Sequence, residues 1–138
     1  MKVVVDTNVL MSGIFFGGVP GRVIDAWVEG RVEMVLSPEI LDEYRRVGSD
    51  LAIRYAERAA VLIPVLTLLA VNATIVNAMP LKEQVSQDAA DDMFLAAAVA
   101  ADVTTIVSGD QHLLDVSEWR GIAVVTPRQF VDRYLLAR

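Results

Sequence analysis

The chain has 138 residues, of which 54% are hydrophobic, and it contains no cysteine. That length fits one domain with a sizeable core, and the missing cysteines exclude disulfides and thiolate metal sites, so a cytoplasmic location is the default expectation. No apolar run reaches the roughly 18 residues that a membrane span needs, so no membrane partner is expected. The net charge of −6 argues against a nucleic-acid-binding protein on bulk electrostatics alone.

Strand-like and helix-like segments alternate along the chain. Runs of β-branched residues bounded by turn-forming residues predict strands, and apolar residues at helical spacing predict helices. The predicted strands are residues 3–5, 32–36, 73–76, 104–107 and 122–125, and the predicted helices are residues 22–29, 39–47, 49–66, 91–101, a short one ending at 114, and 128–136. The pattern predicts one α/β domain over residues 1–138, with a mainly parallel central sheet of about five strands flanked by helices.

Two loops and one helix break are predicted from glycine and proline. Residues 12–21 contain four of the eight glycines around an apolar trio, and we expect them to form a loop. Residues 77–90 form a second predicted loop. Pro64 is expected to kink or end the helix that opens at Ser49, because proline lacks an N–H and clashes with the preceding turn.

Asp6 and Asp110 each follow a predicted strand directly. In open α/β sheets the carboxyl ends of the strands are where ligands bind, so both side chains are candidates for chemistry. Gly109 permits a tight exit that would turn the Asp110 carboxylate back over the sheet edge. The alternative role for Asp6 is an Asx-turn or a helix cap.

The remaining acidic candidates lie on predicted helices or just before them. Glu43 should lie beside the apolar face of its helix, although on its own it also fits a surface glutamate. Asp88, Asp91 and Asp92 precede the most hydrophobic helix of the chain. The helix dipole favours acids in a first turn by about 0.3–1 kcal/mol, but three acids exceed what a cap needs.

Carboxylates that meet at one sheet edge would need a cation. Adjacent strands lie about 5 Å apart, and at an effective dielectric near 20 two charges 4 Å apart repel by roughly 4 kcal/mol. With His112 as the single histidine, the ligands would be mainly oxygens, which favours Mg²⁺ or Mn²⁺ over zinc. A two-metal site hydrolyses phosphodiesters, so the sequence predicts a metal-dependent nuclease.

Four segments in order resemble the PIN-domain family of metal-dependent ribonucleases, which includes VapC-type bacterial toxins. The segments are Val-Val-Asp6-Thr-Asn8-Val-Leu, Ser37-Pro-Glu-Ile-Leu-Asp-Glu43-Tyr, Asp88-Ala-Ala-Asp91-Asp92-Met-Phe-Leu-Ala-Ala-Ala and Ile-Val-Ser108-Gly-Asp110-Gln-His-Leu-Leu. The closing Val-Thr-Pro127-Arg-Gln-Phe130 is also similar to the usual end of the family. The family has a central parallel sheet flanked by helices, which agrees with the predicted fold.

The resemblance implies a set of site residues. The catalytic acids would be Asp6, Glu43, Asp91 and Asp110, with Asn8 and Ser108 as polar helpers at the strand tips. Asp6, Asp91 and Asp110 would hold Mg²⁺ or Mn²⁺, and Glu43 would be a further ligand or would orient water.

The doublet Asp91-Asp92 leaves both residues as candidate ligands. Asp91 is preferred, because Phe94, Leu95 and Ala98 then fall on the apolar positions of the family.

Basic residues cluster just after Glu43. They would contact RNA phosphates, or else form a solvated helix face with Asp50 and Glu57. The four are Arg45, Arg46, Arg54 and Arg58. The resemblance also implies an RNA substrate and, for a toxin, a small antitoxin protein. The apolar stretch 51–69 is a candidate groove or homodimer face, although core packing is the favoured interpretation.

Other functions fit the residues less well. A receiver domain would need a lysine near its aspartate, and neither Lys2 nor Lys82 follows a suitable strand. A haloacid-dehalogenase-type phosphatase would need Asp-x-Asp, but Asn8 stands at the second position. Glycine-rich nucleotide-binding motifs are absent. A non-catalytic PIN scaffold that binds RNA or protein predicts loss of the acids, and all four are present.

Overall fold

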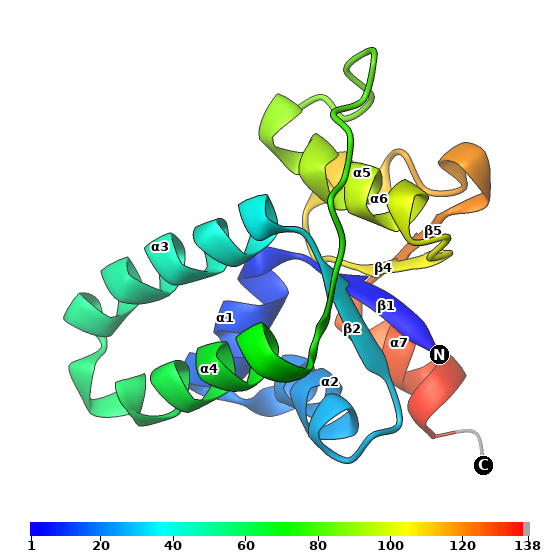
Figure 1. Ribbon diagram of the computed structural model, residues 1–138. Coiled ribbons are helices and arrows are strands. Elements are labelled where there is room, and N and C mark those ends of the chain that lie inside the picture. Colours follow the sequence, from blue (N-terminus) through cyan, green and yellow to red (C-terminus); the bar gives the residue numbers. More distant parts are fainter. Residues whose placement is uncertain (137–138) are drawn as a thin grey trace.

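The computed structural model describes residues 1–136 and has a five-stranded, all-parallel sheet in the order β3-β2-β1-β4-β5 (Figure 1). The strands are β1 (Lys2–Val5), β2 (Glu33–Leu36), β3 (Thr74–Ile75), β4 (Thr105–Val107) and β5 (Ala123–Val125). Each observed strand lies within one or two residues of its predicted bounds. The predicted α/β fold is confirmed.

Helices cover both faces of the sheet. They are α1 (Thr7–Phe16), α2 (Gly18–Val28), α3 (Pro38–Arg54), α4 (Leu62–Asn72), α5 (Asp92–Ala100), α6 (Gln111–Leu114) and α7 (Pro127–Phe130), which a π-helical turn continues over Val131–Leu135. Short 3₁₀ turns occupy Ala56–Val61, Ala89–Asp91 and Trp119–Gly121. In Figure 1, α5 and α6 lie on one side of the sheet, and α2, α4 and α7 lie on the other.

The core accounts for the hydrophobic composition. Val3, Val4 and Val5 are almost fully buried, as expected for a parallel strand covered on both faces. Helix α5 buries Phe94 and Leu95 against the sheet. Within residues 1–136 no single helix is long and apolar enough to cross a membrane, and the bent pair α1 and α2, at 97°, passes that test by length and composition only.

The predicted loop at residues 12–21 is wrong. Helix α1 continues through Phe16, α2 begins at Gly18, and only Gly17 separates them. Gly17 has φ of 72°, a conformation that glycine adopts without strain. Glycines lowered the expected helix propensity, but burial of residues such as Ile14 in the core outweighs that preference.

The predicted helix break also lies elsewhere. Helix α3 runs through Ser49 without interruption and ends at Arg54, so no helix opens at Ser49. Pro64 is the third residue of α4, which starts at Leu62. The first N–H groups of a helix have no partner within it, so a proline there neither kinks nor ends the helix.

Candidate metal centre

The strand order reverses direction beside β1, since β2 and β3 lie on one side of it and β4 and β5 on the other. Ligands of open α/β sheets bind in the crevice at the carboxyl ends of the strands at such a switch point. Asp6 follows β1 there, and its backbone N–H donates to Val107 O at 2.9 Å. Only 4% of Asp6 is exposed. The geometry of its side chain gives no capping hydrogen bond to α1; its Oδ2 accepts instead from Ser108 Oγ at 2.6 Å.

Ser108 joins the ends of β1 and β4. Its side chain is fully buried, and its Oγ also accepts a hydrogen bond from the Asp110 backbone N–H at 2.9 Å. Asp110 in turn caps α6, because its Oδ1 accepts from the His112 backbone N–H at 2.9 Å. The serine therefore fixes the Asp6 carboxylate and the backbone of Asp110 relative to each other.

Glu43 reaches the same region from α3. The buried hydroxyl of Tyr44 donates to the carbonyl of Val5, the residue before Asp6, and thereby anchors α3 at the end of β1. Thr7 Oγ1 donates to Glu43 Oε2 at 2.6 Å. The Glu43 side chain is 23% exposed, so it lies at the edge of the core as predicted from its helix face.

The two aspartates of the doublet have different surroundings. Asp91 is buried, and its Oδ2 has no hydrogen-bond partner. Both oxygens of Asp92 accept backbone hydrogen bonds, from Val85 N at 2.9 Å and from Ser86 N at 2.8 Å. Asp92 therefore holds the preceding loop in place, and this arrangement favours Asp91 over Asp92 as a ligand.

The carboxylates influence one another's protonation. Burial raises the pKa of Asp6; the Ser108 hydrogen bond and the nearby Asn8 backbone N–H oppose that rise, and the charges of Asp110 and Glu43 add to it. The pKa of Asp91 is raised to about 7. Burial is the largest cause, the hydrogen bond and the charge of Asp110 come next, and the charge of Asp6 adds to them. Crowded, buried oxygen donors of this kind suit a hard divalent cation.

One trio of possible metal ligands is more closely spaced than the four predicted acids. Asp88, Asp91 and His112 each offer a ligating atom, and the three atoms all lie within 4.8 Å of one another. In the described part of the chain no other trio of acidic or histidine side chains meets this spacing. The unpartnered oxygen of Asp91 and the donors around it fit a divalent ion, and His112 would add a nitrogen ligand.

The other predicted residues lie nearer the rim or further away. Asn8 is exposed in the first turn of α1. Arg46 lies beside the centre, 3.4 Å from Glu43 Oε1, whereas Arg45 lies 3.7 Å from Asp42. Arg54 follows Glu43 by about 16 Å along α3, at 1.5 Å per residue.

Arg58 packs against α1. Its guanidinium donates to Phe15 O at 3.4 Å and lies 5.2 Å from the centre of the Phe16 ring.

Four further residues hold the acids in place or lie beside them, and the sequence had assigned them no role at the site. Thr7 and Tyr44 stood within the quoted motifs, but no local pattern shows that their hydroxyls reach across to Glu43 and β1. Asp88 and His112 carried a weak signal, because each lies two or three residues from a predicted acid. Only the tertiary fold places them at one point.

Fold and site together define an α/β domain with an acidic centre at its switch point. A family model described as a PIN domain matches residues 2–112, and the chain belongs to the PIN-domain family. The chain is also similar to the uncharacterized protein MJ1680 of Methanocaldococcus jannaschii, with 26% identity over 145 residues that cover 97% of this chain and 92% of that protein. The PIN domain is a nuclease-type fold that generally binds nucleic acid and usually binds a divalent metal. The match includes all four predicted acids.

Proposed function

We propose that the protein is a divalent-metal-dependent endoribonuclease that hydrolyses RNA phosphodiester bonds. The observation that carries this proposal is the convergence of Asp6, Glu43, Asp91 and Asp110 at the switch point, where Asp91 keeps a buried oxygen without a partner. Carboxylates this crowded repel one another unless a cation or a proton neutralises them, and such groups are typical of functional sites. Family membership supports the same activity.

Asp6, Asp91 and Asp110 would hold Mg²⁺ or Mn²⁺. When bound, the ion lowers the pKa of water and neutralises charge on the reacting phosphate. Ser108 keeps the Asp6 carboxylate in one orientation, since its hydroxyl is hydrogen-bonded on both sides. Oδ1 of Asp110 accepts a hydrogen bond from the His112 backbone N–H, and Oδ2 takes no part in this helix cap.

Glu43 would position the attacking water. Thr7 holds Oε2 of this glutamate at 2.6 Å, which leaves Oε1 to accept a proton or a hydrogen bond from water. Arg46, 3.4 Å from Oε1, lies where it could also contact a phosphate of the substrate. Thr7 and Arg46 are therefore positioning residues for the glutamate.

The resemblance to VapC-type toxins extends the proposal to cellular role. The ribonuclease would be the toxin of a toxin–antitoxin pair, neutralised by a small antitoxin protein. Expression of the wild-type protein should then arrest growth of a bacterial host, and Asp6→Ala should relieve the arrest. Growth inhibition by both proteins would contradict a toxin role.

Cleavage of single-stranded RNA tests the activity directly. Purified protein should cleave this RNA in the presence of Mg²⁺ or Mn²⁺, and EDTA should stop the cleavage. Asp6→Ala and Asp91→Ala should each abolish it. Loss of one ligand disables a group of residues that acts as a unit. RNA that stays intact under all conditions but still binds would favour a non-catalytic scaffold. Hydrolysis of small phosphomonoesters instead of RNA would favour a phosphatase.

A further inference from the structure

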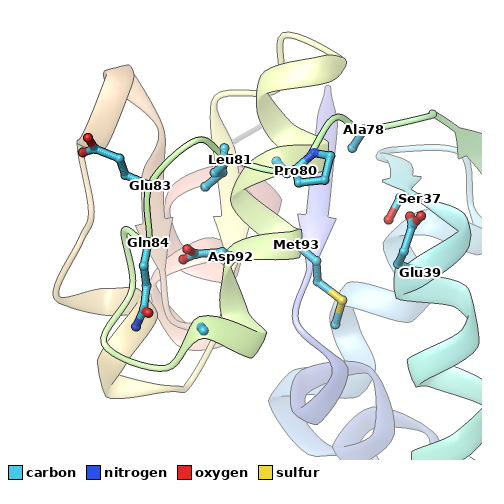
Figure 2. Close-up of a pocket in the computed structure, with 11 residues that line it drawn as sticks. Ser37, Glu39, Ala78, Pro80, Leu81, Glu83, Gln84, Asp92 and Met93 are labelled. Carbon is cyan, nitrogen blue, oxygen red and sulfur yellow. The ribbon is translucent and has the colours of Figure 1, made fainter.

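A cavity of about 420 Å³ is lined by Asp92, the neighbour of Asp91 in the chain, and by none of the four predicted acids themselves. The loop after β3 forms one wall, and the first turns of α3 and α5 form the others (Figure 2). The residues that matter to its chemistry are Glu39, Ala78, Pro80, Leu81, Glu83 and Met93. Small-molecule sites typically measure about 300–1,000 Å³, so one nucleobase fits here.

Three points of the chain connect this cavity to the centre. Ser37 lines it and follows β2, as Asp6 follows the neighbouring parallel strand β1. Glu39 lies one helical turn before Glu43 on α3, a rise of about 6 Å. Asp92 lines the cavity and directly follows Asp91. A nucleotide next to the reacting phosphate would therefore reach the cavity with its base.

The walls select for a neutral, flat group. Apolar side chains such as Met93, Pro80 and Leu81 form much of the lining, and none of the lining residues is a lysine or arginine. The charged residues of the lining are all acidic, namely Glu39, Glu83 and Asp92, so a phosphate would be repelled. An unpaired base can instead lie against the apolar surface and turn its polar edge toward the acids.

The polar groups of the cavity mostly accept hydrogen bonds. Gln84 uses its Nε2 to donate to Ser86 O at 2.9 Å and to Gln87 O at 3.1 Å, which leaves its Oε1 as an acceptor. Both oxygens of Asp92 are already bound to the loop backbone. Glu39 and Glu83 add carboxylate acceptors. The cavity therefore fits a ligand edge that carries N–H donors.

We propose that this cavity is the base-recognition subsite of the nuclease, and that it prefers an unpaired adenine, cytosine or guanine over uracil. The inference rests on the proposed ribonuclease function. The first three bases carry an exocyclic amino group, which a carboxylate accepts, as in the pairing of glutamate with cytosine N4. Uracil has two carbonyl oxygens beside one N–H, and carbonyl oxygens next to carboxylates repel them because both are acceptors.

Cleavage of a matched oligonucleotide series tests the subsite. Each substrate is an oligouridine with one adenosine, cytidine or guanosine at a fixed position, compared with the all-uridine parent. At least one amino-bearing base should raise kcat/KM about 10- to 100-fold and direct cleavage to its neighbouring phosphodiester, the discrimination expected from one well-formed base contact of about 1–3 kcal/mol. Equal rates on all four substrates would overturn the inference and leave the nuclease proposal intact.

Two variants separate the cavity from general effects. Glu39→Gln replaces an acceptor with an amide that can also donate, so it should reduce the preference for amino-bearing bases; Glu57→Gln, the same change at an exposed site outside the cavity, should leave it unchanged. Ala78→Trp should fill the cavity and abolish the preference, whereas Met79→Trp, at a neighbour that is 82% exposed, should not. A preference that survives in both cavity variants would overturn the inference.

A binding measurement tests the base preference of the cavity even if the protein cleaves no RNA. Fluorescence anisotropy with the same oligonucleotides and the wild-type protein in EDTA measures base preference without turnover. Tighter binding of an amino-bearing oligonucleotide, lost in Ala78→Trp, would support the subsite even if the nuclease proposal fails. Equal binding of all four would contradict it.

Discussion

At the residue scale, the acids depend on hydroxyl groups that hold them. Ser108 Oγ donates to Asp6, Thr7 Oγ1 donates to Glu43, and the Tyr44 hydroxyl ties α3 to the strand that ends at Asp6. Each of these bonds joins two elements that are distant in sequence. Partners that orient the ligands of a metal site matter nearly as much as the ligands, and their loss typically costs 10–100-fold in affinity or activity.

Ser108→Ala should therefore lower RNA cleavage by about 10–100-fold without removing any acid. It should also cost roughly 1–3 kcal/mol of stability, because a buried carboxylate oxygen and the Asp110 N–H lose their partner. Single-turnover kinetics and urea denaturation measure the two effects. Ser117→Ala is the matched control, since Ser117 Oγ accepts from Val124 N at 2.8 Å away from the acids. Equal loss of activity in both variants would argue against a positioning role for Ser108.

The raised pKa of Asp91, about 7, predicts a pH dependence of stability. An aspartate in the unfolded chain titrates near 3.9, so between about pH 4 and pH 7 the folded protein binds more protons than the unfolded chain. The stabilisation from protonated Asp91 is complete below that window and is lost as pH rises through it. In EDTA, the free energy of unfolding should fall across this range.

Asp91→Asn should show a smaller fall over the same range, because the amide does not titrate. Asp50→Asn, at an exposed position on α3, should retain the wild-type dependence. Urea denaturation at several pH values gives the comparison. Identical slopes in wild type and Asp91→Asn would show that another group causes the dependence.

At the element scale, strands were more predictable than helix boundaries. The run Val3–Val5 is followed by the turn-forming residues Asp6 to Asn8 and is buried on both faces of the sheet, so the local sequence is sufficient to predict this strand. The chain breaks between α1 and α2 at Gly17, and α2 then packs closely against Gly13 of α1, a contact that local propensity does not show. A Cβ at Gly13 would lie 2.6 Å from Ile24 Cδ1 and 3.1 Å from the Gly21 backbone N.

Gly13→Ala should accordingly destabilise the protein by about 1–3 kcal/mol, the usual cost of overpacking, even though alanine is the better helix former. Gly21→Ala is the control in the next helix. Its Cβ would lie 3.7 Å from Gly13 O, an ordinary contact, so it should be neutral or stabilise by up to about 1 kcal/mol. Chemical denaturation measures both. The same sign for the two changes would contradict this account of the packing.

At the scale of the whole molecule, strand order decides where the acids meet. Alternation of elements predicted a parallel sheet and placed Asp6 and Asp110 at strand ends. It did not predict that β1 and β4 are neighbours, because strand pairing depends on contacts between distant parts of the chain. The closeness of Asp88 and His112 to Asp91 was missed for the same reason. The sequence was therefore sufficient to predict which residue types form the site, but not the distances between their side chains.

Convergence of the acids links metal binding to global stability. A ligand that binds only the folded state stabilises it by mass action, by about 2.7 kcal/mol at 100 times its Kd. Added Mn²⁺ should therefore raise the Tm of the wild-type protein, and Asp6→Asn should reduce that rise. In EDTA, Asp6→Asn should have a higher Tm than the wild type, because one repelling charge is gone and the amide oxygen can still accept from Ser108.

Differential scanning calorimetry with and without Mn²⁺ measures these shifts. Asp42→Asn removes one charge from an exposed position on α3, so it should keep the full response to Mn²⁺. The comparison between the two variants separates loss of a ligand from a change in net charge, since both substitutions alter net charge equally. An equal rise in Tm for wild type and Asp6→Asn would place the ion away from Asp6, with the trio Asp88, Asp91 and His112 as the next site to test by the same substitutions.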